Sequence, residues 1–152
     1  MKAKNTTASL PKEDTVDFNI KFAWHSINRM YNQQASSHDL TTSIGFVLLN
    51  IDSKNGTPAT KIAPLLGMEP RSLSRMLKAL EERNLICRKS DPDDKRLVKI
   101  FLTDLGRQKK DLAKKTVRTF NEAVRIEVST EKLKIFFEVV KDIQKIIDKN
   151  QI

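Results

Sequence analysis

Apolar residues along the chain recur mostly at the three- and four-residue spacing that is typical of helices. In the segment 16–35, Trp24, Ile27 and Tyr31 follow this spacing, which indicates a helix with one apolar face. The segment 41–52 is more uniformly apolar, and this indicates a helix buried on both of its long faces. The first third of the chain is therefore predicted to form two helices.

Two further helices, separated by a short turn, are predicted in the middle of the chain. Thr57 can cap the first of them, Pro58 can take its first helical position and Gly67 can end it. The second, residues 70–83 (PRSLSRMLKALEER), begins with a proline suited to a first helical position, and its apolar stripe consists of Leu73, Met76, Leu77 and Leu80. Asn84 follows, at a position where helices often end in the left-handed conformation.

A change from helical to strand-like spacing follows this helix. The segments 85–90 (LICRKS) and 97–103 (LVKIFLT) are short and rich in branched residues, and they flank the sequence DPDDKR, which predicts a two-stranded hairpin. Two long helices are expected after it, from Asp104 to about Glu127 and from about Glu131 to Asp148. The last helix is apolar around more than one stripe, which favours oligomerisation.

The charge of the chain is concentrated in its middle third. The formal net charge is +9, and residues 60–110 carry 13 Lys and Arg against 7 Asp and Glu. Nucleic acid is the commonest partner of such a basic patch. A basic surface that only keeps the protein in solution fits the composition equally well. The pattern of residues has to distinguish this possibility from nucleic-acid binding.

The composition also limits the compartment and the cofactors. A single cysteine, Cys87, excludes an internal disulfide framework and favours a reducing compartment. No run of 18 apolar residues occurs, and the first 15 residues have no apolar core of a secretory signal. We expect a cytoplasmic protein that does not associate with a membrane, with residues 1–15 as a flexible tail. No cofactor is expected.

The order of these elements is that of a winged helix. A short helix, a turn and a second helix form a helix-turn-helix, and a hairpin directly after it forms the wing. On residues 70–83, Arg71, Arg75 and Lys78 lie opposite the apolar stripe, with Ser72 and Ser74 between the two faces. Arginine can bind guanine O6 and N7 through two hydrogen bonds, so this face suits a DNA major groove.

Residues 59–107 resemble the core of the MarR family of bacterial transcription regulators. The family pattern has an apolar-Gly-apolar turn, a recognition helix bearing Ser or Thr and Arg, then L-x-x-R-G-L, an acidic D-P-x-D-x-R wing and x-L-T-x-x-G. These features recur here as LLGM, the segment 70–83, LEERNL, DPDDKR and FLTDLG, with Asn84 in place of the usual glycine.

The resemblance implies a single domain over residues 16–152. Its winged-helix DNA-binding lobe would be 41–103, and the helices of 16–40 and 104–152 would form a homodimer. The resemblance implies DNA contacts by Arg71, Ser72, Ser74, Arg75 and Lys78 of the recognition helix, and by Asp94, Lys95 and Arg96 of the wing. Arg96 would enter the minor groove, and Asp94 would hold the arginines of that region in place.

Other chemistry has weaker support in the sequence. Asp91, Asp93 and Asp94 lie on a hairpin tip, which supplies neither a cleft nor the converging ligands of a metal or catalytic site. His25 and His38 have no partner at zinc-ligand spacing, so no metal site is expected. Cys87 can be a redox sensor or a structural thiol, and its place in the hairpin favours the structural role. No enzymatic activity is expected.

The function predicted from the sequence is sequence-specific binding of double-stranded DNA at a pseudo-palindromic operator, most simply by a dimeric repressor. A small lipophilic effector, aromatic or acyl in type, would release the DNA. Its pocket would be formed by Trp24, His25, Met30, Tyr31 and Phe46, although plain core packing explains each of these residues as well. The alternative is a basic architectural or RNA-binding module without an effector.

Overall fold

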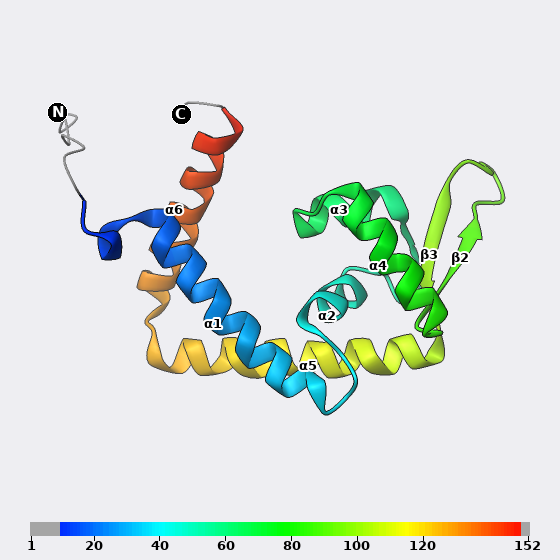
Figure 1. Cartoon of the computed structure of the whole chain (residues 1–152), viewed down its shortest axis with the longest axis horizontal. Helices are drawn as coiled ribbons and strands as arrows, with labels where there is room; N and C mark the ends of the chain where they lie inside the picture. Colours follow the sequence, from blue (N-terminus) through cyan, green and yellow to red (C-terminus); the bar gives the residue numbers. More distant parts are fainter. Residues whose placement is uncertain (1–9, 150–152) are drawn as a thin grey trace. The chain divides into compact units, whose positions relative to one another are not determined.

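The structure is a computed structural model that describes residues 10–149, and helices dominate this range (Figure 1). In chain order the elements are η1 (Lys12–Asp14), α1 (Val16–Ser36), α2 (Thr42–Leu49), β1 (Thr57–Pro58), α3 (Ala59–Leu66), α4 (Pro70–Glu82), β2 (Ile86–Ser90), β3 (Val98–Leu102), α5 (Asp104–Glu127) and α6 (Thr130–Asp148). This order confirms the predicted fold class, a mainly helical winged helix-turn-helix with a small wing. Residues 1–9 of the expected tail lie outside the described range.

The sheet has three strands, whereas the sequence predicted a two-stranded hairpin. The strand order is β1-β3-β2, and both pairings are antiparallel. Thr57 pairs with Ile100 of β3, and its hydroxyl accepts a hydrogen bond from the backbone N–H of Asp52 at 2.8 Å. Thr57 therefore closes the preceding loop and does not cap α3. Pro58, predicted as the first helical residue, has extended backbone angles and stands just before the helix.

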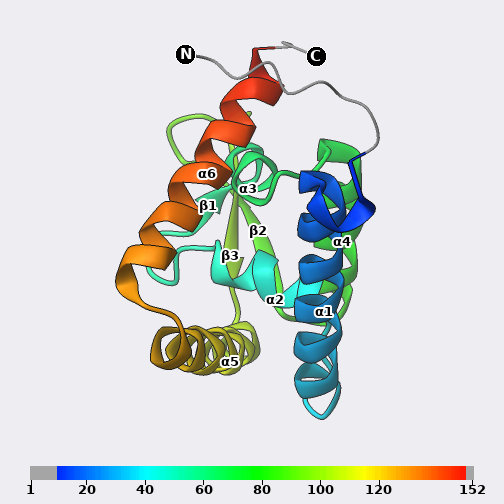
Figure 2. The ribbon, with the colours of Figure 1, turned by 90° about the vertical axis from the view of Figure 1, so that its left-hand side faces the viewer.

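The core of the protein lies where α2, α3, α4 and the sheet meet. Its fully enclosed side chains are apolar, and they are Leu40, Val47, Leu48, Ile51, Ile62, Ala63, Leu73, Leu77, Leu80, Leu85, Ile86, Ile100 and Leu102. Each helix contributes its apolar stripe to this cluster, so the burial of these stripes determines which face of α4 is left to solvent. The three strands beside these helices can be followed in Figure 2.

The chain divides into two compact units within α5, one ending at Ala113 and one beginning at Lys114. The whole buried core belongs to the first unit, and none of residues 114–149 is buried. In the second unit α6 exposes large apolar side chains, among them Ile135, Phe136 and Ile147. No helix within residues 10–149 has both the length and the apolar character needed to cross a membrane.

A close backbone contact joins the end of α4 to the start of α5. Asn84, two residues after α4, has φ 56°, and its carbonyl accepts a hydrogen bond from the Thr103 hydroxyl at 2.7 Å. The same hydroxyl accepts the N–H of Gly106 at 3.0 Å and so caps α5. A Cβ atom on Gly106 would lie only 1.9 Å from the carbonyl oxygen of Leu85. Only glycine allows this approach.

We predict that Gly106→Ala destabilises the protein. Adding a methyl group to a site without space displaces the backbone of Leu85 or of α5, and such overpacking typically costs about 1–3 kcal/mol. Urea denaturation followed by circular dichroism measures the free energy of unfolding and checks this loss.

Gly45→Ala is the matched control for this substitution. A Cβ on Gly45 would meet the Ala113 Cβ at 3.5 Å, which is an ordinary contact, and Gly45 lies inside α2. Alanine at this helical position should leave the free energy of unfolding unchanged or raise it by up to about 1 kcal/mol. Equal effects of the two substitutions would contradict the close contact at Gly106.

Candidate nucleic-acid interface

The turn between α3 and α4 is built around Gly67. This residue has φ 60°, and the N–H of Met68 donates to the carbonyl of Ala63 at 3.0 Å, which ends α3 in a left-handed turn. Pro70 then occupies the first turn of α4, where its missing N–H has no helical partner to lose. Together α3, this turn and α4 form a helix-turn-helix.

The solvent-facing side of α4 carries the predicted basic residues. Leu73, Leu77 and Leu80 are buried, whereas all five predicted contact residues of α4 are exposed, namely Arg71, Ser72, Ser74, Arg75 and Lys78. The ion pairs among residues 10–149 do not include any of the three cations. This face of α4 is therefore positively charged and not neutralised by neighbouring carboxylates.

One hydroxyl on α4 is already engaged within the helix. Ser74 Oγ donates to the carbonyl oxygen of Pro70 at 3.0 Å, whereas its lone pairs remain able to accept a hydrogen bond. Serine hydroxyls inside helices commonly bond back to the preceding turn in this way. Ser74 can thus serve as an acceptor toward a ligand more readily than as a donor.

The wing is the hairpin of β2 and β3, which extends beyond α3 and α4 in Figure 1. Five residue pairs hold the two strands in register, from Ile86 opposite Leu102 to Ser90 opposite Val98. The hairpin was predicted with its strands within one residue of these bounds. Its tip is the DPDDKR sequence, residues 91–96.

Asp91 holds the tip of the wing in one conformation. Its carboxylate accepts the N–H of Asp93 at 2.9 Å and that of Asp94 at 3.4 Å, and Lys99 Nζ lies 3.5 Å from its other oxygen. The hydrogen bond from the Asp93 amide is the main cause of a pKa below the ordinary value for Asp91, with the charge of Lys99 contributing. The carboxylate is therefore charged at neutral pH and stabilises the turn.

The structure gives Asp94 a different contact from the one that the resemblance implies. Its carboxylate accepts the backbone N–H of Arg96 at 3.0 Å, and no guanidinium among the described residues pairs with it. Asp94 thus orients the main chain at Arg96 and leaves the arginine side chain free to reach a ligand. Lys95 and Arg96 are both exposed at the tip.

Other cations of the lobe bind groups of the protein itself, and no pattern in the sequence indicated these contacts. Arg88 Nε donates to Glu81 at 3.1 Å, which joins β2 to α4, and Lys89 Nζ lies 5.1 Å from the centre of the Phe101 ring. These contacts depend on the hairpin register and on the direction of α4. Neither can be derived from spacing along the chain.

The residues predicted for an effector pocket separate into two groups. Trp24 and Tyr31 each place their ring 6.1 Å from that of Phe46, so these three form an aromatic cluster between α1 and α2. Tyr31 is buried, and burial raises the pKa of its hydroxyl. His25 is not part of this cluster and lines a hollow along α1. Met30 is half-buried on the same helix.

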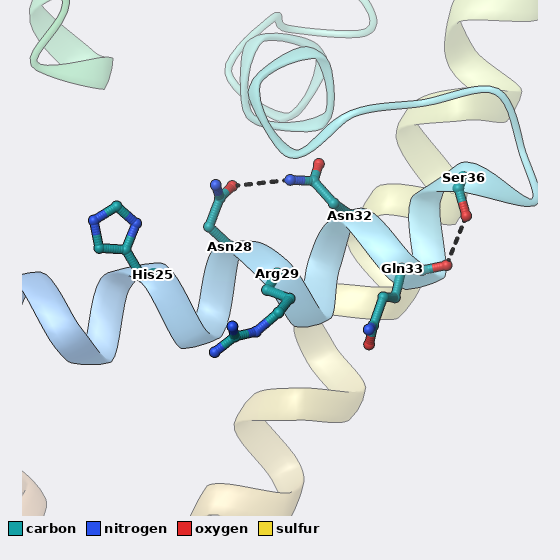
Figure 3. Close-up of a pocket in the computed structure, with 6 residues that line it drawn as sticks. All are labelled: His25, Asn28, Arg29, Asn32, Gln33 and Ser36. Atoms are coloured by element: carbon teal, nitrogen blue, oxygen red, sulfur yellow. Dashed lines mark hydrogen bonds between the residues drawn. The ribbon is translucent and has the colours of Figure 1, made fainter.

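An open, polar hollow of about 660 Å³ lies along one face of α1 (Figure 3). It is lined by His25, Asn28, Arg29, Asn32, Gln33 and Ser36, which recur at helical spacing. Figure 3 shows Asn28 and Asn32 on the side of α2, where Asn32 Oδ1 accepts both the N–H and the hydroxyl of Thr42. Of the predicted pocket residues, only His25 lines this hollow.

Cys87 lies on β2 opposite Phe101 and is half-buried. No group of three or more His, Cys, Asp or Glu residues suited to a metal ion occurs within residues 10–149. His38 contributes its backbone carbonyl, not its ring, to a contact with Lys109. The exposed groups of α4 and the wing tip are cations and hydroxyls, which can bind an anion.

Comparison with known proteins finds relatives for the part of the chain that carries this geometry. Residues 40–98 match the model of the MarR family. A curated relative, the HTH-type transcriptional regulator TtmR of Methylorubrum extorquens, is 34% identical over 90 residues, which are 59% of this chain and 46% of TtmR. The chain thus aligns with about half the length of the curated relatives that it matches.

Solved structures agree over most of the chain. The S. aureus MepR–DNA complex superposes with a TM-score of 0.80 at 20% identity and covers 88% of this chain and 98% of MepR. The transcriptional repressor CouR bound to a 23-mer DNA duplex gives a TM-score of 0.74 at 26% identity, with 90% and 99% covered. CouR of Rhodococcus jostii RHA1 bound to p-coumaroyl-CoA gives a TM-score of 0.76 at 21% identity, and the superposition covers 89% of this chain and 95% of that CouR chain.

These relatives are named as transcriptional regulators, and the family is not one of enzymes. The match covers α2, α3, α4 and β2 and reaches the first residue of β3, so it includes the exposed cations of α4 and of the wing tip. Over residues 40–98 the chain is similar to the MarR family of transcription regulators, and its fold is that of their solved winged-helix structures.

Proposed function

We propose that this protein is a dimeric repressor that binds double-stranded DNA at a pseudo-palindromic operator and is released by a small lipophilic effector. The single observation that carries the proposal is the exposed face of α4. Arg71, Arg75 and Lys78 lie there opposite the buried leucines and take part in no ion pair of residues 10–149.

The chemistry of this face suits the major groove. An α-helix fits the width of the groove, and the two-pronged donor of arginine matches O6 and N7 of guanine. Ser72 and Ser74, beside the arginines, can bind bases or phosphates. We therefore propose that α4 is the recognition helix and that it reads the base sequence of the DNA.

The wing supplies the second contact in this proposal. Its exposed tip residues Lys95 and Arg96 are cations, and the turn that presents them is held by the carboxylates of Asp91 and Asp94. An arginine on a narrow tip can enter a minor groove, where a narrow A·T-rich groove attracts positive charge. The two contacts would then lie in adjacent grooves of one duplex.

Dimerisation is proposed from the apolar surfaces at the two ends of the chain. On α1, Val16, Phe22 and Trp24 expose roughly half or more of their surface, and on α6 Ile135, Phe136 and Ile147 do so too. Exposed apolar patches of this kind mark protein contacts. A two-fold dimer would present two α4 helices to successive major grooves, one helical turn or about 34 Å apart.

An effector site is proposed along α1. The aromatic cluster of Trp24, Tyr31 and Phe46 can contact an aromatic or acyl group, and His25 and Arg29 of the neighbouring hollow can bind polar or anionic groups. CouR of Rhodococcus jostii RHA1, 21% identical to this chain and similar in fold, has been solved with p-coumaroyl-CoA. This supports an aromatic or acyl thioester ligand, which must bind the DNA-free state more tightly in order to release DNA.

The alternative, a basic architectural or RNA-binding module, requires no sequence preference. Selection of duplexes from a random library, followed by salt titrations of the selected and a random duplex, separates the two functions. For a regulator, the affinity for the selected duplex should exceed the affinity for the random duplex by at least about a thousandfold. Both affinities should fall with salt concentration at the same slope. Equal affinities would exclude the regulator. Adding aromatic acids and acyl thioesters to the same assay tests whether an effector weakens binding.

We predict different losses for the two kinds of arginine. Arg75→Ala should weaken binding to the selected duplex by about 1–3 kcal/mol and relax the preference for one base. Arg96→Ala should also weaken binding to the selected duplex. Its change in base preference should be smaller than that of Arg75→Ala or limited to A·T-rich positions, because minor-groove contacts respond mainly to groove shape. Fluorescence anisotropy on single-base variants of the duplex measures both effects.

Lys141→Ala on α6 is the control for these variants, since it removes one exposed positive charge from the second unit. Its effect on the affinity should be small, and its effect on base preference absent. If Arg75→Ala changed all duplexes by the same factor, as a phosphate contact would, α4 would not read bases through this residue.

We predict that Phe22→Asp converts a dimer into a monomer. Phe22 is 65% exposed on α1, and a charge there would have to be buried in a dimer contact. Light scattering during gel filtration should give twice the chain mass for the wild type and one chain mass for the variant. Leu65→Asp, on α3, changes an apolar residue of similar exposure, 63%, and should remain dimeric. A wild-type monomer would refute the dimer.

A further inference from the structure

The loop between α1 and α2, residues 37–41, is held by side chains from two other helices. Arg83, at the end of α4, donates from Nη2 to the carbonyl oxygen of Asp39 and to its carboxylate, the latter at 2.8 Å. Lys109 of α5 donates from Nζ to the carbonyl of His38 at 2.5 Å. Two adjacent carbonyls of this loop therefore receive donors from α4 and α5.

The loop presents these acceptors in a fixed direction. Asp39 takes a left-handed backbone with φ 55°, which aspartate tolerates better than most residues. The N–H of Leu40 donates to Ala35 of α1 at 3.1 Å, and the Leu40 side chain is buried in the core. The direction of the Asp39 carbonyl is thus set by the end of α1.

Arg83, the donor of these contacts, is held in place by the backbone contacts that follow α4. Arg83 directly follows α4 as its C-terminal cap, and Asn84 and Leu85 after it bind Thr103 just before α5. The guanidinium of Arg83 therefore spans a short distance between two backbones that are each held independently. A single nitrogen, Nη2, makes both contacts, so one donor group holds the backbone carbonyl and the carboxylate of Asp39 together.

We propose that the contact of Arg83 with Asp39 is a positioning clamp that sets the direction of α4 relative to α1. The Asp39 carboxylate is 92% exposed, and exposed ion pairs add little to stability, so the contact serves geometry more than folding. The consequence for DNA rests on the proposed function. Because α1 carries the proposed dimer surface, the clamp fixes the separation of the two α4 helices and hence the preferred spacing of half-sites.

The first test measures this direction in the protein without DNA. In a Cys87→Ser background, spin labels are placed at Gln34→Cys on α1 and Ala79→Cys on α4, and the labelled chain is diluted into unlabelled protein. Arg83→Met and Asp39→Asn should each broaden or shift the distribution of label distances within one chain. Asparagine keeps both the left-handed backbone and the carbonyl, so Asp39→Asn removes the ion pair alone.

Glu81→Gln is the matched control, because it breaks another exposed arginine–carboxylate pair of α4, the 3.1 Å contact with Arg88. It should leave the distribution unchanged. The combination of Arg83→Met with Asp39→Asn should change the distribution no more than Arg83→Met alone, as expected of two residues acting through one contact. A distribution unaltered in both single variants would overturn the clamp, whatever the protein does with DNA.

The second test measures the spacing preference on the selected duplex. One base pair inserted at its centre separates the half-sites by about 3.4 Å and rotates them by about 34°. Wild type and Glu81→Gln should lose affinity about tenfold, whereas Arg83→Met should lose about threefold or less. An equal penalty in all three proteins would overturn the role in spacing. A wild type without sequence preference would instead refute the proposed function, while the distance measurement still decides on the clamp.

Discussion

The close approach of Gly106 to the carbonyl of Leu85 is the constraint on which the rest of the DNA-binding lobe depends. The contact has no room for a side chain, and the Thr103 hydroxyl beside it binds both the end of α4 and the start of α5. Because β2 begins at Ile86, directly after this contact, α4, the wing and α5 all start or end within a few residues of one point. Their relative directions follow from it.

The Lys and Arg residues of the protein fall into two groups, those that bind acceptors within the protein and those that enter no ion pair. Several Lys and Arg residues bind acceptors of the protein itself, namely Arg83, Arg88, Lys99, Arg107, Lys109 and Lys110. Those on the outer face of α4 and at the wing tip, Arg71, Arg75, Lys78, Lys95 and Arg96, enter no ion pair of residues 10–149. The positive charge of this helix face and this turn is therefore available to a polyanion, which can neutralise it.

Local signals in the sequence predicted most of the elements, because each rests on contacts between near neighbours in the chain. The leucine stripe of α4 and the left-handed Asn84 are both of this kind, and each occurs as expected. Contacts between distant segments were missed. The strand β1 exists only because β3 lies beside it, and the pair of Asp39 with Arg83 joins residues 44 positions apart. In the candidate site, spacing indicated which residues are exposed but not what Asp94 binds.

The short strand β1 also affects how this protein can meet other chains. A sheet edge with free N–H and C=O groups can pair with a strand from another molecule, which leads to aggregation. Here one edge is only two residues long and contains Pro58, which has no N–H to donate, and the other edge, β2, carries Arg88 and Lys89. Both edges therefore discourage strand addition. Self-association of the folded lobe through its sheet is disfavoured, even though the hairpin extends into solvent.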